Sequence, residues 1–277
     1  MIKKRTANGN RRWILVTISI AAVGFSALFV AVVMQARQRT PEEISQTTQE
    51  TWGRFLLEIY APRRESPQAA CVVRLQAIAD SLTTTLHTTP VHVSVALDKK
   101  INAVSLPGRR VVVYDGLMLD VESENEIAMI LAHEIGHHEA NHILEAFGRR
   151  AFLGLASMGA GQIPVLGPIL VQIGELGELS FSREAELEAD RIGLRALHDY
   201  YGHVGGSTGF FERRLKEGEI PAAMELLSTH PLSEKRIESL KILSRNQGWE
   251  ARPVAPALEP CPRWDRPGEW AGNRVRD

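Results

Sequence analysis

Two histidines and a glutamate lie close together in the segment LAHEIGHHEANH, residues 131–142. His133 and His137 are four residues apart, so both imidazoles project from the same face of a helix and can bind one metal ion. Glu134 follows His133 directly, and its carboxylate can accept a proton from a water molecule that the metal activates. This H-E-x-x-H pattern is typical of zinc hydrolases.

The flanking residues predict that this segment is helical. Ser123 and Glu126 form the S-x-x-E pattern of a capping box, and apolar residues then recur at helical spacing: Ile127, Ile130, Leu131, Ile135. Two solvated histidines on a surface helix are the alternative interpretation. Because the histidines are embedded in an apolar helix, the sequence favours a metal site.

A second helix offers a third ligand. In residues 180–190, Glu186 and Asp190 are four residues apart and share one face. Glu186 is the natural third ligand, and Asp190 suits an acceptor that orients a zinc-bound histidine. Two histidines and one glutamate leave a fourth position for water, as catalysis requires. Glu184 and Glu188 lie off this face, and we expect them to be solvated; all four acids could instead only stabilise the first turn of the helix.

The N-terminal 36 residues predict a membrane anchor. Residues 1–12 are basic, and residues 13–34 carry no charge. A helix of that length is about 33 Å long, enough to cross a bilayer. Positive charge then places residues 1–12 in the cytoplasm, residues 13–36 in the membrane and the rest outside the cytoplasm. A cleaved signal peptide is the alternative, but residues 34–37 make a poor cleavage site.

The remainder is expected to form one domain, residues 37–250, followed by a Pro- and Arg-rich tail, residues 251–277. Two scaffold helices are predicted, from Thr40 to about Tyr60 and from Ser66 onward. The near-balanced net charge of −1, without a basic stripe beyond the N-terminus, argues against a nucleic-acid partner.

A second charge-free run covers residues 151–174 and is interrupted by Pro164 and Pro168. If Glu186 binds the same metal as His133, this run cannot span the membrane, because both ligands must lie about 2 Å from one ion. Two short apolar helices remain, either in the core or on the membrane surface.

Three short strands are predicted before the metal helix, at residues 91–97, 101–106 and 109–114. We expect a small antiparallel three-stranded sheet. It could only pack on the helices, or its edge could hold an extended peptide by main-chain hydrogen bonds. In the second case the substrate-binding residues would be Asn102, Ala103 and Val104.

Four blocks resemble the gluzincin zinc metallopeptidases of the CAAX-prenyl-protease type, peptidase family M48. They are NAVSLPGRRVVVYDGLM, HEIGH, SREAELEAD and STHPLSEKRI, in that order, between about residues 70 and 242. The resemblance implies one zinc ion per chain, endopeptidase activity and a mostly helical α+β fold. It also implies that His230 and Arg236 are active-site groups, either of which could stabilise an oxyanion.

The resemblance is strongest to single-anchor or periplasmic bacterial members and to mitochondrial inner-membrane quality-control relatives. It implies a bacterial inner-membrane protein with its catalytic domain in the periplasm, acting on unfolded or misassembled envelope proteins. The chain has fewer membrane segments than the multi-spanning prenyl proteases. A zinc-stabilised module that binds unfolded chains with little turnover is the competing class. Cys71 and Cys261 could form a disulfide outside the cytoplasm or remain two buried thiols.

Overall fold

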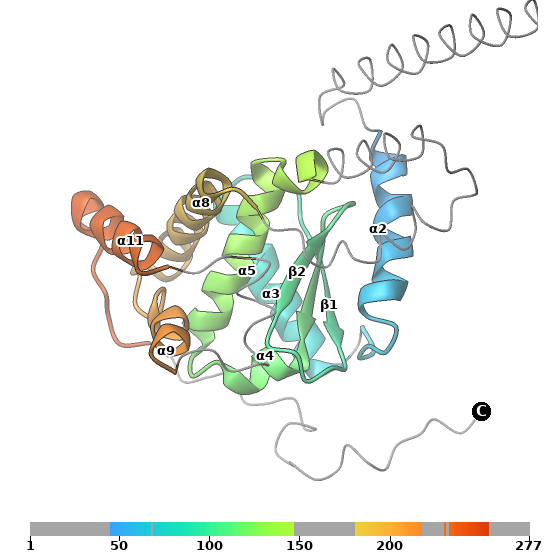
Figure 1. Cartoon of the computed structure of the whole chain (residues 1–277), viewed down its shortest axis with the longest axis horizontal. Helices are drawn as coiled ribbons and strands as arrows, with labels where there is room; N and C mark the ends of the chain where they lie inside the picture. Colours follow the sequence, from blue (N-terminus) through green and yellow to red (C-terminus); the bar gives the residue numbers. More distant parts are fainter. Residues whose placement is uncertain (1–44, 68, 147–180, 218–229, 231–232, 255–277) are drawn as a thin grey trace, which may run out of the picture. The chain divides into compact units, whose positions relative to one another are not determined.

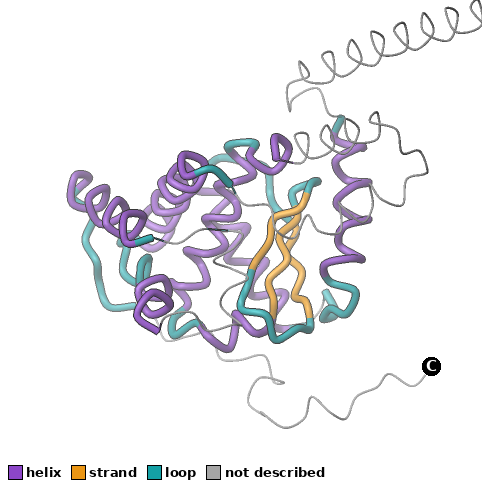
Figure 2. The backbone as a smooth tube through the Cα atoms, viewed as in Figure 1, coloured by secondary structure: helices purple, strands orange, loops and turns teal. Residues whose placement is uncertain are grey.

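The computed structural model describes residues 45–67, 69–146, 181–217, 230 and 233–254, which are coloured in Figure 1. Helices dominate this part of the chain and surround one small sheet (Figure 2). The helices are α2 (Gln46–Tyr60), α3 (Ala70–Thr85), α4 (Asp115–Asp120), α5 (Glu124–Glu139), α8 (Arg183–Tyr201), α9 (Gly209–Glu217) and α11 (Glu234–Gln247). The expected mostly helical α+β architecture is confirmed.

Several predicted features lie outside the described residues. They are the anchor at residues 13–36, the apolar run at residues 151–174, Cys261 and nearly all of the tail. Among the helices that the structure does describe, none is long and apolar enough to cross a bilayer. Cys71, on α3, is disulfide-bonded.

Serine side chains fix the first residue of each helix that carries the site. The hydroxyls of Ser123, Ser182 and Ser233 each accept a backbone N–H three residues on, at 3.2–3.3 Å, and so cap α5, α8 and α11. The predicted capping box on α5 forms only in part. The Glu126 carboxylate accepts the N–H of Glu122 at 2.7 Å, one residue before the cap.

The sheet consists of β1 (His92–Ala96), β2 (Ala103–Leu106) and β3 (Arg110–Tyr114) in the order β1-β3-β2. β2 and β3 form the expected antiparallel hairpin, but β1 pairs with β3 in parallel, so the predicted antiparallel meander was wrong. Residues 97–102 between β1 and β2 are too many for a tight hairpin. They carry the chain past the end of β3, which therefore takes the centre.

The central position suits the sequence of β3. After Arg110, its residues Val111–Tyr114 are apolar or aromatic without alternation and all buried, as expected for a strand covered on both faces. Alternate residues of the sheet, among them Val93, Ala103 and Val111, join the core formed with α3 and α5. The opposite face lies against α2 (Figure 1), and the Tyr114 hydroxyl donates to the Tyr60 carbonyl at the end of that helix.

Helices α5 and α8 pack closely because each presents a glycine to the backbone of the other where they cross. A Cβ on Gly136 would lie 2.8 Å from the Ala189 carbonyl oxygen, and one on Gly193 would lie 2.9 Å from the His133 nitrogen. Since real Cβ atoms do not approach backbone this closely, any larger residue would push the helices apart. The close approach brings the acids of α8 next to the histidines of α5.

His138 provides a pH-dependent contact between α5 and the sheet. Its Nε2 lies 3.2 Å from the carbonyl oxygen of Arg110, on β3. Burial, with a smaller effect from the Arg109 charge, lowers the pKa of His138 to about 3. A histidine in the unfolded chain has a pKa near 6.5, so the unfolded state binds this proton first as pH falls. The neutral imidazole therefore stabilises the fold above about pH 6.5, and this contribution is lost towards pH 3.

As pH falls from 6.5 to 5, we expect the unfolding free energy of the metal-free protein to decrease by about 2 kcal/mol, because His138 takes up a proton only in the unfolded state. His138→Gln should remove this part of the pH dependence, measured by urea unfolding in the presence of chelator. His92→Gln, at an exposed position on β1, is the matched control and should behave like wild type. Equal pH slopes for wild type and His138→Gln would contradict this prediction.

Candidate metal centre

The predicted metal ligands meet in a buried cluster. His133 and His137 project from α5 and Glu186 from the first turn of α8, which lies beside α5 (Figure 1). His230 joins them from the segment that precedes α11. One nitrogen or oxygen from each of the four side chains lies within 4.8 Å of all the others. Every one of these residues is buried.

The separations fit one tetrahedral zinc ion. Nε2 of His133 lies 3.0 Å from Nε2 of His137. The first lies 3.5 Å from Oε2 of Glu186 and the second 3.5 Å from Oε1. Nδ1 of His230 lies 3.3 Å from His133 Nε2 and 3.1 Å from Glu186 Oε1. With zinc–ligand distances of about 2.0–2.1 Å, the edges of a tetrahedron are about 3.3 Å long. The donor set of imidazoles and a carboxylate also suits zinc.

Glu134 lies next to this cluster with its carboxylate buried. Its Oε1 is 3.3 Å from Nε2 of His230. Its Oε2 has no hydrogen-bond partner among the described residues. An acceptor oxygen beside a metal site is the arrangement that a general base requires.

Asp190 and Arg236 form a second layer around the ligands. Oδ1 of Asp190 lies 2.9 Å from Nδ1 of His133, the nitrogen that faces away from the other ligands. The Arg236 guanidinium donates two bonds to Asp190, at 2.8 and 2.7 Å, and its third nitrogen lies 2.6 Å from Glu186 Oε2. Asp190 therefore lies where the sequence predicts it. Arg236 contacts both carboxylates, and this geometry is suited to fixing their orientation.

The pKa values of the cluster reflect this pairing. Burial raises the pKa of both acids, but other contacts outweigh it. Contacts with the three histidines of the cluster lower the pKa of Glu186 below the ordinary range. Contacts with Arg236 and His133 lower the pKa of Asp190. Burial lowers the pKa of His137 well below its usual value. Burial acts the same way on His133, but hydrogen bonds with Asp190 and Glu186 raise its pKa to about 9. A metal ion must therefore displace a proton from His133 at neutral pH.

Two residues near the cluster were missed in the sequence. The Phe181 ring stacks on His137, with centroids 4.0 Å apart, and lies 5.6 Å from the His230 ring. Phe181 also lines a pocket of about 660 Å³ that includes Glu186 and Arg236. His142 lies 3.1 Å from His137, nitrogen to nitrogen. Their only signals in the sequence were their positions, five residues before Glu186 and five after His137.

The predicted substrate strand lies at one edge of the sheet, next to α5. The Tyr114 N–H donates to the Asn102 carbonyl, so in an antiparallel ladder the main-chain groups of Ala103 and Ser105 point away from β3. The Asn102 side chain already accepts the Ala103 N–H at 2.8 Å. The Ser105 hydroxyl donates to the Glu134 carbonyl at 3.2 Å, which ties this edge to the helix that carries the base.

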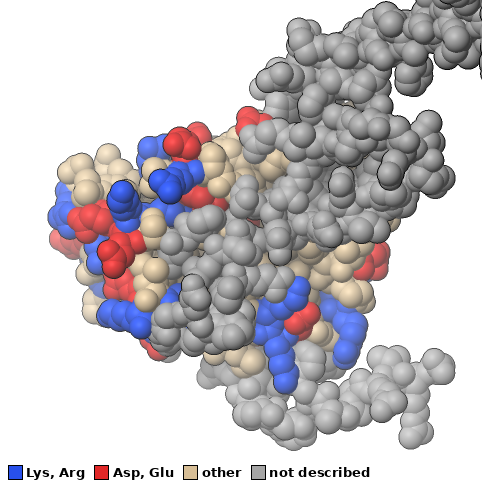
Figure 3. Space-filling view, viewed as in Figure 1, with Lys and Arg blue, Asp and Glu red and all other residues tan. Residues whose placement is uncertain are grey.

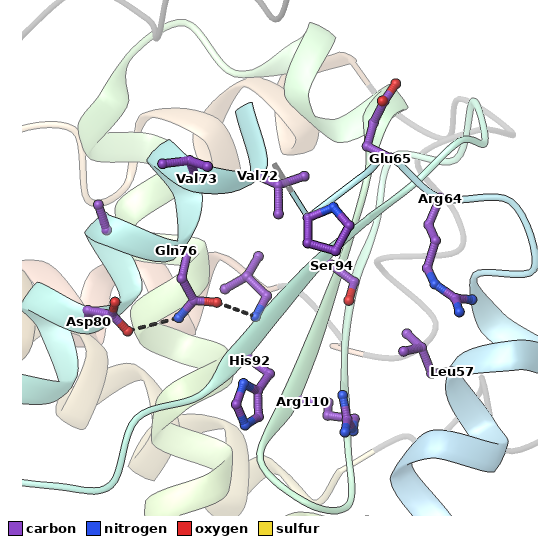
Figure 4. A pocket seen from close by; sticks show the side chains of 13 residues that line it. Leu57, Arg64, Glu65, Val72, Val73, Gln76, Asp80, His92, Ser94 and Arg110 are labelled. Carbon is purple, nitrogen blue, oxygen red and sulfur yellow. Dashed lines mark hydrogen bonds between the residues drawn. The ribbon is translucent and has the colours of Figure 1, made fainter. Parts of the chain in front are cut away.

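The opposite edge of the sheet, β1, is covered by side chains and by another segment. The Gln76 amide donates to the Val91 carbonyl at 2.7 Å. It also accepts the Val93 N–H at 2.8 Å, a contact drawn as a dashed line in Figure 4. Arg64 then pairs with Ala96 in a β-bridge. A pocket of about 590 Å³ lies here, lined mainly by α3 and β1. Since these contacts occupy β1, the β2 edge is the better candidate for pairing with a peptide.

The expectation that Glu184 and Glu188 are solvated is confirmed, because both are exposed.

On the face of the molecule in Figure 3, acidic and basic side chains are interspersed over the described residues.

Comparison with known proteins gives a family match. The model of Peptidase family M48 matches residues 66–244. The chain is 37% identical over 152 residues to the mitochondrial metalloendopeptidase OMA1 of Schizosaccharomyces pombe. The aligned region covers 52% of this chain and 44% of that protein. The chain is 28% identical over 181 residues to the beta-barrel assembly-enhancing protease of Escherichia coli, which covers 60% and 36% respectively. The metalloprotease LoiP of Escherichia coli is 29% identical over 178 residues, with 61% and 68% covered. The chain thus spans less than half the length of the first two relatives.

Proposed function

Because this chain belongs to peptidase family M48, we propose that it is a zinc-dependent endopeptidase whose active site is the cluster on α5 and α8. The observation that carries the proposal is the set of ligand separations of 3.0–3.5 Å beside the Glu134 carboxylate. Bound zinc would supply a Lewis acid and would lower the pKa of a water ligand.

Each residue of this site then has a defined role. His133, His137 and Glu186 hold the metal. Glu134 accepts the proton that the attacking water loses and returns it to the leaving amine. Asp190 keeps His133 oriented with Nε2 towards the metal. The Arg236 charge offsets part of the negative charge of the two carboxylates that it contacts, which lowers the free energy of burying them.

The β2 edge is proposed to hold the substrate as an extended strand. The Ala103 carbonyl and both main-chain groups of Ser105 point away from β3 and could pair with a peptide. The Ala103 N–H is already bonded to Asn102, so pairing would begin at the Ala103 carbonyl. Because Ser105 also bonds Glu134, a peptide paired there would lie close to the general base.

His230 is proposed to regulate access to the metal. Its Nδ1 lies 3.3 Å from His133 Nε2 and 3.1 Å from Glu186 Oε1, where it could bind the metal at the fourth position that catalysis leaves to water. Its Nε2 also contacts the base at 3.3 Å. In this arrangement His230 holds the enzyme inactive, and its departure opens the site.

His230→Ala is expected to raise the basal cleavage of an unfolded protein while zinc stays bound through the other three ligands. The measurement is the cleavage rate of unfolded casein together with the zinc content of the same samples. If His230 instead stabilises an oxyanion, the rate should fall by about a hundredfold. An unchanged rate in the folded variant would contradict both roles.

The proposed substrates are misfolded or misassembled envelope proteins. Support comes from two relatives, the beta-barrel assembly-enhancing protease of Escherichia coli and the mitochondrial metalloendopeptidase OMA1 of Schizosaccharomyces pombe. The proposed location is the periplasmic side of a bacterial inner membrane, with residues 13–36 as a single-pass anchor. The disulfide at Cys71 supports an oxidising compartment. A mature N-terminus near residue 37 would contradict the anchor and favour release by signal cleavage.

The substrate class is tested by comparing the envelope proteomes of cells that carry wild type or Glu134→Gln. We expect unfolded or misassembled envelope proteins to accumulate with Glu134→Gln. An identical envelope proteome in both strains, under conditions that unfold envelope proteins, would contradict this substrate class.

A further inference from the structure

His142 lies against the metal ligand His137, on the side opposite to the metal. Nδ1 of His142 is 3.1 Å from Nδ1 of His137, and the two ring centroids are 5.1 Å apart. Nε2 of His137 faces the other metal ligands. His142 is 6% exposed and His137 is fully buried. The contact is therefore shielded from water. In such a buried environment a hydrogen bond has its largest effect on side-chain orientation.

The backbone brings His142 to this place by a reversal after α5. Five residues along a regular helix correspond to a rotation of about 140°, so a continuing helix would direct His142 away from His137. The helix instead ends at Glu139, and Asn141 adopts a φ of 58°, in the left-handed region that asparagine tolerates better than most residues. Helix resumes at residues 142–146.

The segment after the reversal is held in place by packing. Ile143 and Ala146 form a small apolar cluster with Phe181, whose ring stacks on His137. His137 is thus fixed by a ring on one side and by a polar contact on the other.

The proton positions follow from the geometry. If Nε2 of His137 binds zinc, its only proton is on Nδ1 and points at Nδ1 of His142. Nδ1 of His142 must then accept, which places the proton of a neutral His142 on Nε2. The Glu188 carboxylate lies 3.5 Å from that Nε2 and favours this tautomer.

We propose that His142 is the positioning residue of His137: it accepts the Nδ1–H and keeps the Nε2 lone pair directed at the metal. His133 has an anionic partner for the same task, Asp190. A neutral partner at His137 suits the charge of the site. The carboxylates of Glu134, Glu186 and Asp190 are already balanced by one guanidinium and a divalent cation, and another buried carboxylate would leave an uncompensated charge.

The inference rests on the proposed zinc site and is tested by zinc affinity, measured by competition with a chromophoric chelator. Two variants remove the acceptor: His142→Leu, and His142→Phe, which keeps an aromatic ring beside Phe181. We expect zinc affinity to fall about 10- to 100-fold in both. His142→Asn places a carbonyl oxygen near the position of Nδ1 and should restore affinity to near the wild-type value. Ile143→Ala is the control for packing and should lower zinc affinity less than His142→Leu does.

A second measurement reads the tautomer directly. In ¹⁵N-labelled, zinc-loaded wild type, the Nδ1–H of His137 should give a slowly exchanging NMR signal, which His142→Asn keeps and His142→Leu loses. Wild-type zinc affinity in His142→Leu and His142→Phe would overturn the inference. So would equal losses in His142→Asn, or in Ile143→Ala. Failure of the wild type itself to bind zinc would overturn the proposed metal site, and the inference with it.

Discussion

Glu134→Gln is expected to lower the rate of peptide hydrolysis about 10²- to 10⁴-fold while the protein still binds one zinc ion. The ligand atoms of His133, His137 and Glu186 are untouched by this change. The variant loses only the carboxylate that accepts a proton, and a neutral amide of the same size cannot replace it. The measurement is the cleavage rate of an unfolded protein, with zinc content determined on the same preparation.

The buried position of Glu134 makes the zinc measurement necessary. Its carboxylate is 1% exposed and contacts His230, so the substitution could shift that histidine. The matched control is the double variant with His230→Ala, in which this contact is absent. Hydrolysis at the wild-type rate by zinc-loaded Glu134→Gln would exclude Glu134 as the base.

Glu186→Gln should bind zinc far more weakly than wild type, because the charged ligand of the site becomes a neutral amide. The change also leaves the Arg236 guanidinium with one fewer carboxylate, so the variant should unfold at a lower temperature. The measurement is the zinc dissociation constant, with the unfolding temperature taken in the absence of metal to separate the two effects.

Glu188→Gln is the matched control on the same helix. Glu188 is two residues further along α8, and its side chain is 52% exposed. It lies outside the set of ligand atoms, and an amide oxygen at this position can still accept from His142. We expect wild-type zinc affinity. Equal zinc affinities in Glu186→Gln and Glu188→Gln would mean that Glu186 is not a ligand.

The centre of the site could be predicted because each half of it lies within one turn of one helix. The spacing of His133 and His137, and that of Glu186 and Asp190, fixes a common face whatever the rest of the chain does. The glycines Gly136 and Gly193 then decide how closely the two faces approach, and that depends on the packing of two helices. The spacing therefore predicted the ligands without predicting the distance between the helices.

The sheet shows where sequence patterns are insufficient. The pattern in residues 91–114 predicted three strands in an antiparallel meander, but alternation carries no information on which strand lies in the middle. The predicted strands left only residues 98–100 between the first two, whereas the connection in the structure is residues 97–102 and β3 lies between β1 and β2. His142 was missed for a similar reason, because its position depends on the positive φ of Asn141 and not on helical periodicity.

The most direct test of the central claim is a zinc titration of peptide cleavage. The full-length protein is freed of metal with a chelator, and casein cleavage is measured as zinc is added in known amounts. We predict no cleavage without metal and a rise that saturates at one zinc ion per chain. Cleavage that persists without metal would contradict the account, as would zinc-dependent retention of casein without any cleavage in both wild type and His230→Ala, the result expected of a binding module.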